Sequence, residues 1–88
     1  NYAICMAAEA GHIDIVKLLL ENDLVDPSDD GNDAIRSAYH QGHYEICYLL
    51  FKRKEVRNKK IFHLSKEELK DLIYQIKKYE IEDKIKDF

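Results

Sequence analysis

Histidine and cysteine are the residues of this chain best suited to bind a metal ion or to attack a substrate, and the sequence contains four histidines and two cysteines. His40 and His43 are three residues apart, but Gly42 lies between them and interrupts the helix that would align their rings. No pair of these residues has the short spacing that is typical of zinc sites. We therefore expect no metal site.

Neither cysteine is in a setting that favours nucleophilic catalysis. A reactive thiol needs an accessible, electropositive environment and an oriented base, whereas Cys47 lies in an apolar stretch and no catalytic groups gather near Cys5. The chain also lacks a glycine-rich phosphate loop. We expect neither an enzyme nor a bound cofactor. Two isolated cysteines are too few for the disulfide framework of a small secreted domain, which favours an intracellular location, cytoplasmic or nuclear.

Charge is divided unevenly along the chain. Residues 1–50 contain two basic and nine acidic residues, whereas the overall net charge is only −3, so the remainder is net basic. The sharpest cluster is the basic run, residues 52–60. One interpretation is a nuclear-import or phosphate-binding segment, which makes a nucleic-acid-associated module the alternative function. The favoured interpretation is that these cations complement the negative C-terminal pole of the preceding helix and continue into a solvated linker.

The elements that carry these residues repeat along the sequence with a period of 31 residues. The identities fall at positions that should pack in a helical protein. They pair Asn1 with Asn32, Ala3 with Ala34, Ile4 with Ile35, Ala7 with Ala38, Gly11 with Gly42, His12 with His43, Ile15 with Ile46, Leu18 with Leu49, Leu19 with Leu50 and Val25 with Val56. The period and the packing positions together indicate a repeat architecture.

Each copy has the pattern of two short helices. Small and apolar residues follow a helical stripe up to Gly11, where a left-handed residue would end the first helix. A second helix with a row of leucines follows. The second copy breaks in the same way at Gly42, and the stretch 25–31 between the copies contains the Pro, Asp and Gly residues of a tight turn.

The pattern Ala-x-x-x-Gly-His-x-x-Ile-x-x-Leu-Leu, at Ala7–Leu19 and again at Ala38–Leu50, resembles the ankyrin repeat. The resemblance implies an all-α solenoid of stacked helix pairs, each followed by a turn called the finger. Two features depart from the family pattern. The Thr-Pro-Leu-His entry to the first helix is missing, so we expect Asp33 or Asn32 to cap that helix, and the finger is two residues short. The finger style and the Lys-, Ile-, Asn- and Tyr-rich composition are similar to ankyrin arrays of amoebal or giant-virus type.

The resemblance also implies where a protein partner would bind, since ankyrin stacks use the finger tips and the exposed face of the first helices. The implied residues of this chain are Asn1, Glu9, Ala10, Asp29, Asp30, Asn32, Tyr39, His40 and Gln41. Tyr39 replaces a usual alanine, so its ring either fills a gap or protrudes toward this face. The alternative is that all of these are solvated polar positions. The acidic finger favours a basic or hydrogen-bond-donating partner.

The last third of the chain does not continue the repeat. Ser65 and Glu68 form a capping-box pattern, and Leu69, Leu72, Ile73 and Ile76 follow it at helical spacing. The apolar phase then slips, which predicts a bend near Tyr79–Glu80 and a second short helix over 81–87. We interpret this segment as a degenerate capping repeat. The alternative is an amphipathic helix that pairs with another chain.

The sequence therefore predicts four segments: repeats at 1–31 and 32–56, a basic linker at 57–64 and capping helices at 65–88. No apolar run is long enough for a transmembrane helix, so we expect no membrane contact. We expect a non-catalytic protein-interaction scaffold, monomeric within a longer chain and forming the C-terminal end of a longer ankyrin array.

Overall fold

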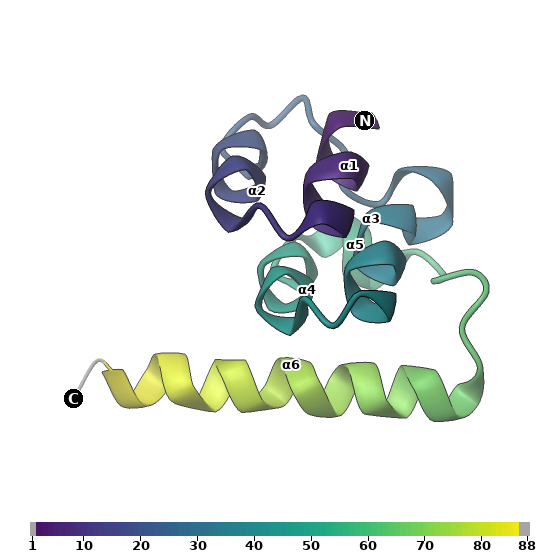
Figure 1. The fold of residues 1–88 in the computed structure, drawn as a ribbon, viewed down its shortest axis with the longest axis vertical. Coiled ribbons are helices and arrows are strands. Elements are labelled where there is room, and N and C mark those ends of the chain that lie inside the picture. The colour runs from purple at the N-terminus through teal and green to yellow at the C-terminus, as the bar shows by residue number, and fades with distance from the viewer. Residues whose placement is uncertain (1, 87–88) are drawn as a thin grey trace.

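A computed structural model describes residues 2–86 of the chain, and this part consists of helices joined by short loops (Figure 1). The helices are α1 Tyr2–Ala10, α2 Ile13–Leu20, α3 Asp29–His40, α4 Tyr44–Phe51, α5 Lys54–Asn58 and α6 Lys66–Lys86. The described residues contain no strand, which confirms the all-α solenoid predicted from the repeat. None of these helices has the length and apolar character needed to cross a membrane.

The first four helices form two similar pairs that stack on each other. Helix α1 packs against α3, and α2 packs against α4. Each pair turns at a glycine in the left-handed region, Gly11 at φ +80° and Gly42 at φ +76°, as the sequence predicts. Residues of these pairs supply most of the buried core, which comprises Ile4, Ala7, Ala8, Val16, Ala34, Ile35, Ala38, Ile46, Cys47, Leu50, Val56, Leu72 and Ile76.

The basic run begins differently from the sequence-based expectation. Residues 54–58 form the short helix α5, which places Val56 in the core, and the extended stretch that follows begins at Lys59. The segment 57–64 expected to be a solvated linker thus starts inside a helix. Its later part is also structured, because the backbone N–H of Phe62 donates to the carbonyl of Gly31 at 3.1 Å.

Helix α6 packs along α4 and runs across the end of the second helix pair (Figure 1). The predicted capping box is present: the Ser65 N–H donates to Glu68 Oε1 at 2.9 Å, and the Glu68 N–H donates to Ser65 Oγ at 3.1 Å. The predicted bend near Tyr79–Glu80 is wrong, because α6 is one helix from Lys66 to Lys86. Leu72 and Ile76 face the stack, whereas Ile81 and Ile85 are exposed on the same continuous helix. The change in the spacing of apolar residues after Ile76 therefore marks a second apolar face of α6 and not a break in the helix.

Candidate protein-binding face

The loop that leads into α3 is a turn with two kinds of local constraint. The Asp26 carboxylate accepts hydrogen bonds from the Ser28 N–H at 3.0 Å and the Ser28 hydroxyl at 2.6 Å. These bonds, with a smaller contribution from Lys59, hold the pKa of Asp26 below its usual value. Three successive residues, 30–32, then adopt left-handed backbone angles. Glycine and asparagine tolerate this conformation best, and they occupy positions 31 and 32.

The side chain of Asn32 holds this turn against the backbone at the end of α5. Its Nδ2 donates to the carbonyls of Val56 and Lys59, both at 3.0 Å, and lies 3.5 Å from the carbonyl of Lys60. The residue is fully buried. Asn32 was expected either to cap the α3 helix or to contact a partner, and both expectations are wrong. Its amide is directed away from the helix, because it satisfies carbonyls at the end of α5.

Phe62 holds the turn from the other side. A Cβ built on Gly31 would lie 2.0 Å from Phe62 Cδ2, so the ring occupies the space left by the missing side chain. A shallow depression of about 290 Å³ remains here. Asp29 and Asp30 are exposed beside it. We call residues 29–30 the acidic turn; its backbone is fixed from both sides while its carboxylates remain accessible.

A second group of the expected partner-binding residues lies at the C-terminal ends of α1 and α3. Glu9 and Ala10 end α1, His40 ends α3 and is followed by Gln41, and all four are exposed. Because α1 and α3 pack side by side, these residues share one region of the surface. They are separated from the acidic turn by the length of α3. Asn1, the remaining residue of the expected set, lies outside the described residues.

Two of the expected partner-binding residues, Tyr39 and His40, contact helix α6. The Tyr39 hydroxyl donates to Asp71 Oδ2 at 2.8 Å, so the half-buried ring packs toward α6. Burial, reinforced by Asp71, raises the pKa of Tyr39 to about 12. His40 Nε2 lies 3.3 Å from Glu68 Oε2 and remains partly exposed.

A small polar group between α1 and α3 was not predicted from the sequence. Arg36 Nη2 pairs with Asp33 Oδ1 within α3, and Asp33 also interacts with the Cys5 thiol on α1. All three side chains are partly exposed. The signal was present in the repeat, since Cys5 and Arg36 occupy equivalent positions of α1 and α3.

Neither thiol is suited to attack a substrate at neutral pH. Burial and the nearby carboxylate of Asp33 raise the pKa of Cys5 to about 11. Burial raises the pKa of Cys47 to about 12, and its Sγ lies 3.7 Å from the carbonyl of Ile35. A protonated thiol is a poor nucleophile. Among residues 2–86 no three His, Cys, Asp or Glu side chains are grouped so that they could hold a metal ion.

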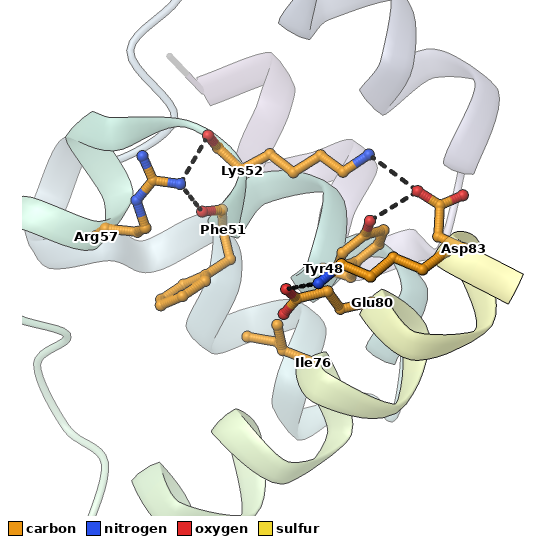
Figure 2. Close-up of a pocket in the computed structure, with 8 residues that line it drawn as sticks. Tyr48, Phe51, Lys52, Arg57, Ile76, Glu80 and Asp83 are labelled. Atoms are coloured by element: carbon orange, nitrogen blue, oxygen red, sulfur yellow. Dashed lines mark hydrogen bonds and ion pairs between the residues drawn. The ribbon is translucent and has the colours of Figure 1, made fainter. Parts of the chain in front are cut away.

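Arginines of the basic run bind backbone carbonyls of the stack. Arg53 donates to the carbonyls of Leu20 at 3.2 Å and Val25 at 3.1 Å, and so ties the second repeat to the first. Arg57 donates to the carbonyls of Phe51 and Lys52, which are the last carbonyls of α4 (Figure 2). The carbonyls of Leu20, Phe51 and Lys52 lie at helix C-termini and lack intrahelical partners, whereas that of Val25 lies in the loop before α3.

Lysines of the same run pair with acids from other segments. Lys59 Nζ lies 3.2 Å from Asp26 Oδ2, and Lys52 Nζ lies 3.8 Å from Asp83 Oδ2 on α6. Lys60 Nζ lies over the Phe62 ring at 5.5 Å from its centre. Most cations of the run therefore have partners within the fold.

A groove of about 420 Å³ lies where α4 and α5 meet α6 (Figure 2). Phe51 and Ile76 supply its apolar lining. The Tyr48 hydroxyl donates to Asp83 Oδ2 at 2.9 Å, and Glu80 pairs with Lys84 at 3.4 Å. Burial and the bond to Asp83 raise the pKa of Tyr48. The polar groups shown in Figure 2 form hydrogen bonds or ion pairs within this group of residues. The groove therefore lies along the contact between α6 and the helices of the second repeat.

Comparison with known proteins identifies one family. The family model for ankyrin repeats (three copies) matches residues 1–60, which include both helix pairs, the acidic turn and α5. No curated protein and no solved structure matches the chain.

Proposed function

The chain belongs to the ankyrin-repeat family, whose members generally mediate protein–protein interaction, and we propose that it is a non-catalytic scaffold that binds another protein. The observation that carries this proposal is the acidic turn. Two exposed carboxylates, Asp29 and Asp30, sit on a backbone that Asn32 and Phe62 hold in place. A surface that is ordered before binding loses less conformational entropy when a partner docks.

The charge of the acidic turn suggests the chemistry of the partner. Asp29 and Asp30 are both exposed at its tip, where Asp29 Oδ1 accepts the Asp30 N–H at 3.2 Å. A basic or hydrogen-bond-donating segment would complement them. The exposed residues at the ends of α1 and α3 extend the proposed contact area along the same helices.

We further propose that the chain is the C-terminal end of a longer ankyrin stack. Equivalent residues of the two repeats support this. Ile46 on α4 is 1 % exposed beneath α2, whereas its counterpart Ile15 on α2 is 48 % exposed. Leu18 is likewise 67 % exposed. The outer face of the first helix pair thus carries apolar residues equivalent to those that the second pair buries in stacking, but they are uncovered. A further helix pair would bury them.

The other end of the stack is covered by α6. Tyr48 stacks with Tyr79 at 6.4 Å between ring centres, and Leu72 and Ile76 are buried. An array end needs such a cover because an open stacking face is apolar. The combination of one open and one covered end is what a terminal segment of an array requires.

Binding can be tested by affinity capture with the chain as bait and a carboxamide pair as the informative variant. Asp29→Asn with Asp30→Asn keeps the shape of the turn and removes its charge. The matched control is Asp14→Asn with Asp23→Asn, which removes two exposed carboxylates elsewhere. The proposal expects proteins captured by the parent chain and by the control to be lost with the turn variant. Equal capture by all three would refute the assigned site.

Nucleic-acid binding through residues 52–60 is the competing function, and the same experiment separates the two. Lys54 and Lys60 can be changed to alanine without removing the carbonyl contacts of Arg53 and Arg57. A nucleic-acid partner would be lost with that variant, and its affinity would fall steeply with salt concentration. We expect the lysine variant to capture the same proteins as the parent chain.

A further inference from the structure

Helix α6 has a second face that the stack does not use. Tyr74, Ile81 and Ile85 are 60 %, 58 % and 62 % exposed, and Ile73 is 44 % exposed. Tyr74, Ile81 and Ile85 lie on the side of α6 away from α4, because Leu72 and Ile76 face inward, and Ile73 lies at the margin of this side. Tyr74 and Ile81 are seven residues apart and so share one line along the helix.

The charged residues in the middle of this outer side, around Tyr74, are lysines. Lys70, Lys77 and Lys78 are exposed between the apolar residues, and Lys78 Nζ lies 5.5 Å from the centre of the Tyr74 ring. Within the part of the chain that the structure describes, none of the three lysines forms an ion pair. We call this surface the outer stripe; it consists of Lys70, Ile73, Tyr74, Lys77, Lys78, Ile81 and Ile85.

The acids in the middle of α6 are turned toward the stack, and the exposed ones lie toward the ends of the outer side. Asp71 contacts Tyr39, and Asp83 contacts Tyr48 and Lys52, so these two carboxylates are directed toward the stack. Glu67, seven residues before Tyr74, and Glu82, three residues before Ile85, are exposed near the two ends of the stripe. Between Lys70 and Lys78 the charges of the outer side are therefore positive.

A helix that only closed an array would need a polar outer face to remain soluble. The outer stripe instead places a tyrosine and three isoleucines in solvent along one side of a straight helix. Aligned, exposed apolar residues of this kind mark an interaction surface. Lys70 and Lys77, also seven residues apart, run beside the line of Tyr74 and Ile81, as charged residues flank the apolar seam of a helix pair.

We infer that the outer stripe binds an acidic amphipathic helix of a partner protein. Its apolar residues would cover Tyr74, Ile81 and Ile85, and its Asp or Glu side chains would pair with the three lysines. A second copy of this chain is disfavoured, because two outer stripes would place lysines against lysines. This surface is separate from the acidic turn and would recognise a partner of opposite charge.

Fluorescence anisotropy with a labelled synthetic peptide tests the inference on the complete chain. The probe has about 18 residues, with leucines at the two seam positions of each heptad and glutamates elsewhere. A peptide of the same composition in scrambled order is the control ligand. The informative variants are Ile81→Ser with Ile85→Ser, and Lys77→Glu with Lys78→Glu.

The matched controls change exposed residues of the same types elsewhere, Leu24→Ser and Lys54→Glu. All four positions of the stripe variants are exposed, so each variant should melt at the temperature of the parent chain. We expect both stripe variants to weaken binding at least about tenfold, as loss of central contacts does. Leu24→Ser, Lys54→Glu and the acidic-turn variant should bind as the parent does.

Three results would overturn the inference. The first is no binding of the patterned peptide at concentrations up to about 1 mM, the weak limit of specific association. The second is equal binding by the scrambled peptide or by the stripe variants. The third is another occupant: tighter binding of vesicles of phosphatidylcholine and phosphatidylserine than of the peptide, or a dimer in sedimentation that Ile81→Ser with Ile85→Ser abolishes.

Discussion

The imidazole ring of His43 lies against Gly11, so closely that a Cβ on Gly11 would be 2.7 Å from its Cε1. This contact joins the second repeat to the first at equivalent positions of a glycine–histidine pair. Gly42 has no equivalent contact within residues 2–86, where no atom lies within 4 Å of a Cβ built on it. At the other end His12, the counterpart of His43, is exposed. The two glycines therefore share one backbone conformation and differ in their neighbours.

Replacing each glycine by alanine separates backbone strain from this contact. Gly42→Ala should lower the free energy of unfolding by about 1–2 kcal/mol, because alanine is strained at positive φ. Gly11→Ala should cost more, since the ring of His43 must also move. Urea unfolding of both variants measures the difference. Equal losses would contradict the contact, and in a double variant His43→Ala should remove the extra cost.

Asn32 should be the least replaceable polar residue of the finger. Asn32→Asp places a carboxylate against the carbonyls of Val56 and Lys59, where the amide now donates. We expect a loss of roughly 3 kcal/mol or more, the cost of a buried group left without a donor. Asn22→Asp is the matched control, because its exposed Oδ1 can still accept from the Leu24 N–H. Urea midpoints for the two variants that shift equally would contradict the assigned role.

The loss of stability as pH falls below neutral should depend in part on Asp26. Its pKa is lowered in the folded state, mainly by the Ser28 hydroxyl, so its contribution is complete above the unfolded pKa and is lost as pH falls through the folded pKa. In Asp26→Asn the melting temperature should therefore fall less between neutral pH and pH 3. Asp14→Asn, at an exposed position, should leave the profile unchanged. A profile for Asp26→Asn that parallels the parent would contradict this assignment.

At alkaline pH the attachment of α6 should depend on Tyr39. Burial and Asp71 raise its pKa to about 12, so the stabilisation is complete below the unfolded value near 10 and is lost as pH rises toward 12. Tyr39→Phe should lower stability at neutral pH by about 1 kcal/mol and flatten the decline above pH 10. Tyr74→Phe, at a 60 % exposed position of α6, is the control for both effects. Thermal melts across this pH range measure them.

The parts of the fold that depend on local pattern were predictable. The helix pairs, the glycine turns and the Ser65–Glu68 capping box each follow from residues close together in the sequence. The role of Asn32 at the start of α3 was not predictable, because its amide donates to carbonyls 24 to 28 residues away. No spacing rule reveals such a partner. The same holds for Tyr39, whose side chain is positioned by Asp71 on α6.

The continuity of α6 shows how a correct observation led to a wrong structure. The apolar phase does slip after Ile76, and a bend is the usual explanation when a helix has one buried face. Here Tyr79 and Asp83 continue the inward face by contacting Tyr48, while Ile81 and Ile85 continue the outer face on which Tyr74 lies. Periodicity alone cannot distinguish a broken helix from one with two faces.

Among the proposed partner-binding residues, local sequence identified the exposed ones and could not exclude the buried one. Asp29, Asp30, His40 and Gln41 are exposed as expected for finger and helix-end positions. Asn32 has similar polarity and lies two residues from Asp30, yet it is fully buried. The difference arises from the left-handed run 30–32, which turns its side chain under the finger.

The most direct test of the proposed terminal position in a stack is the melting temperature of a chain carrying an extra copy of residues 1–31 ahead of residue 1. If the outer face of α1 and α2 is a stacking face, the added repeat should raise the melting temperature. Ile15→Asp, tolerated in the present chain at a 48 % exposed position, should then cost about 1.5–3 kcal/mol, the value of a buried isoleucine. An unchanged melting temperature, with Ile15→Asp tolerated equally in both chains, would contradict the account.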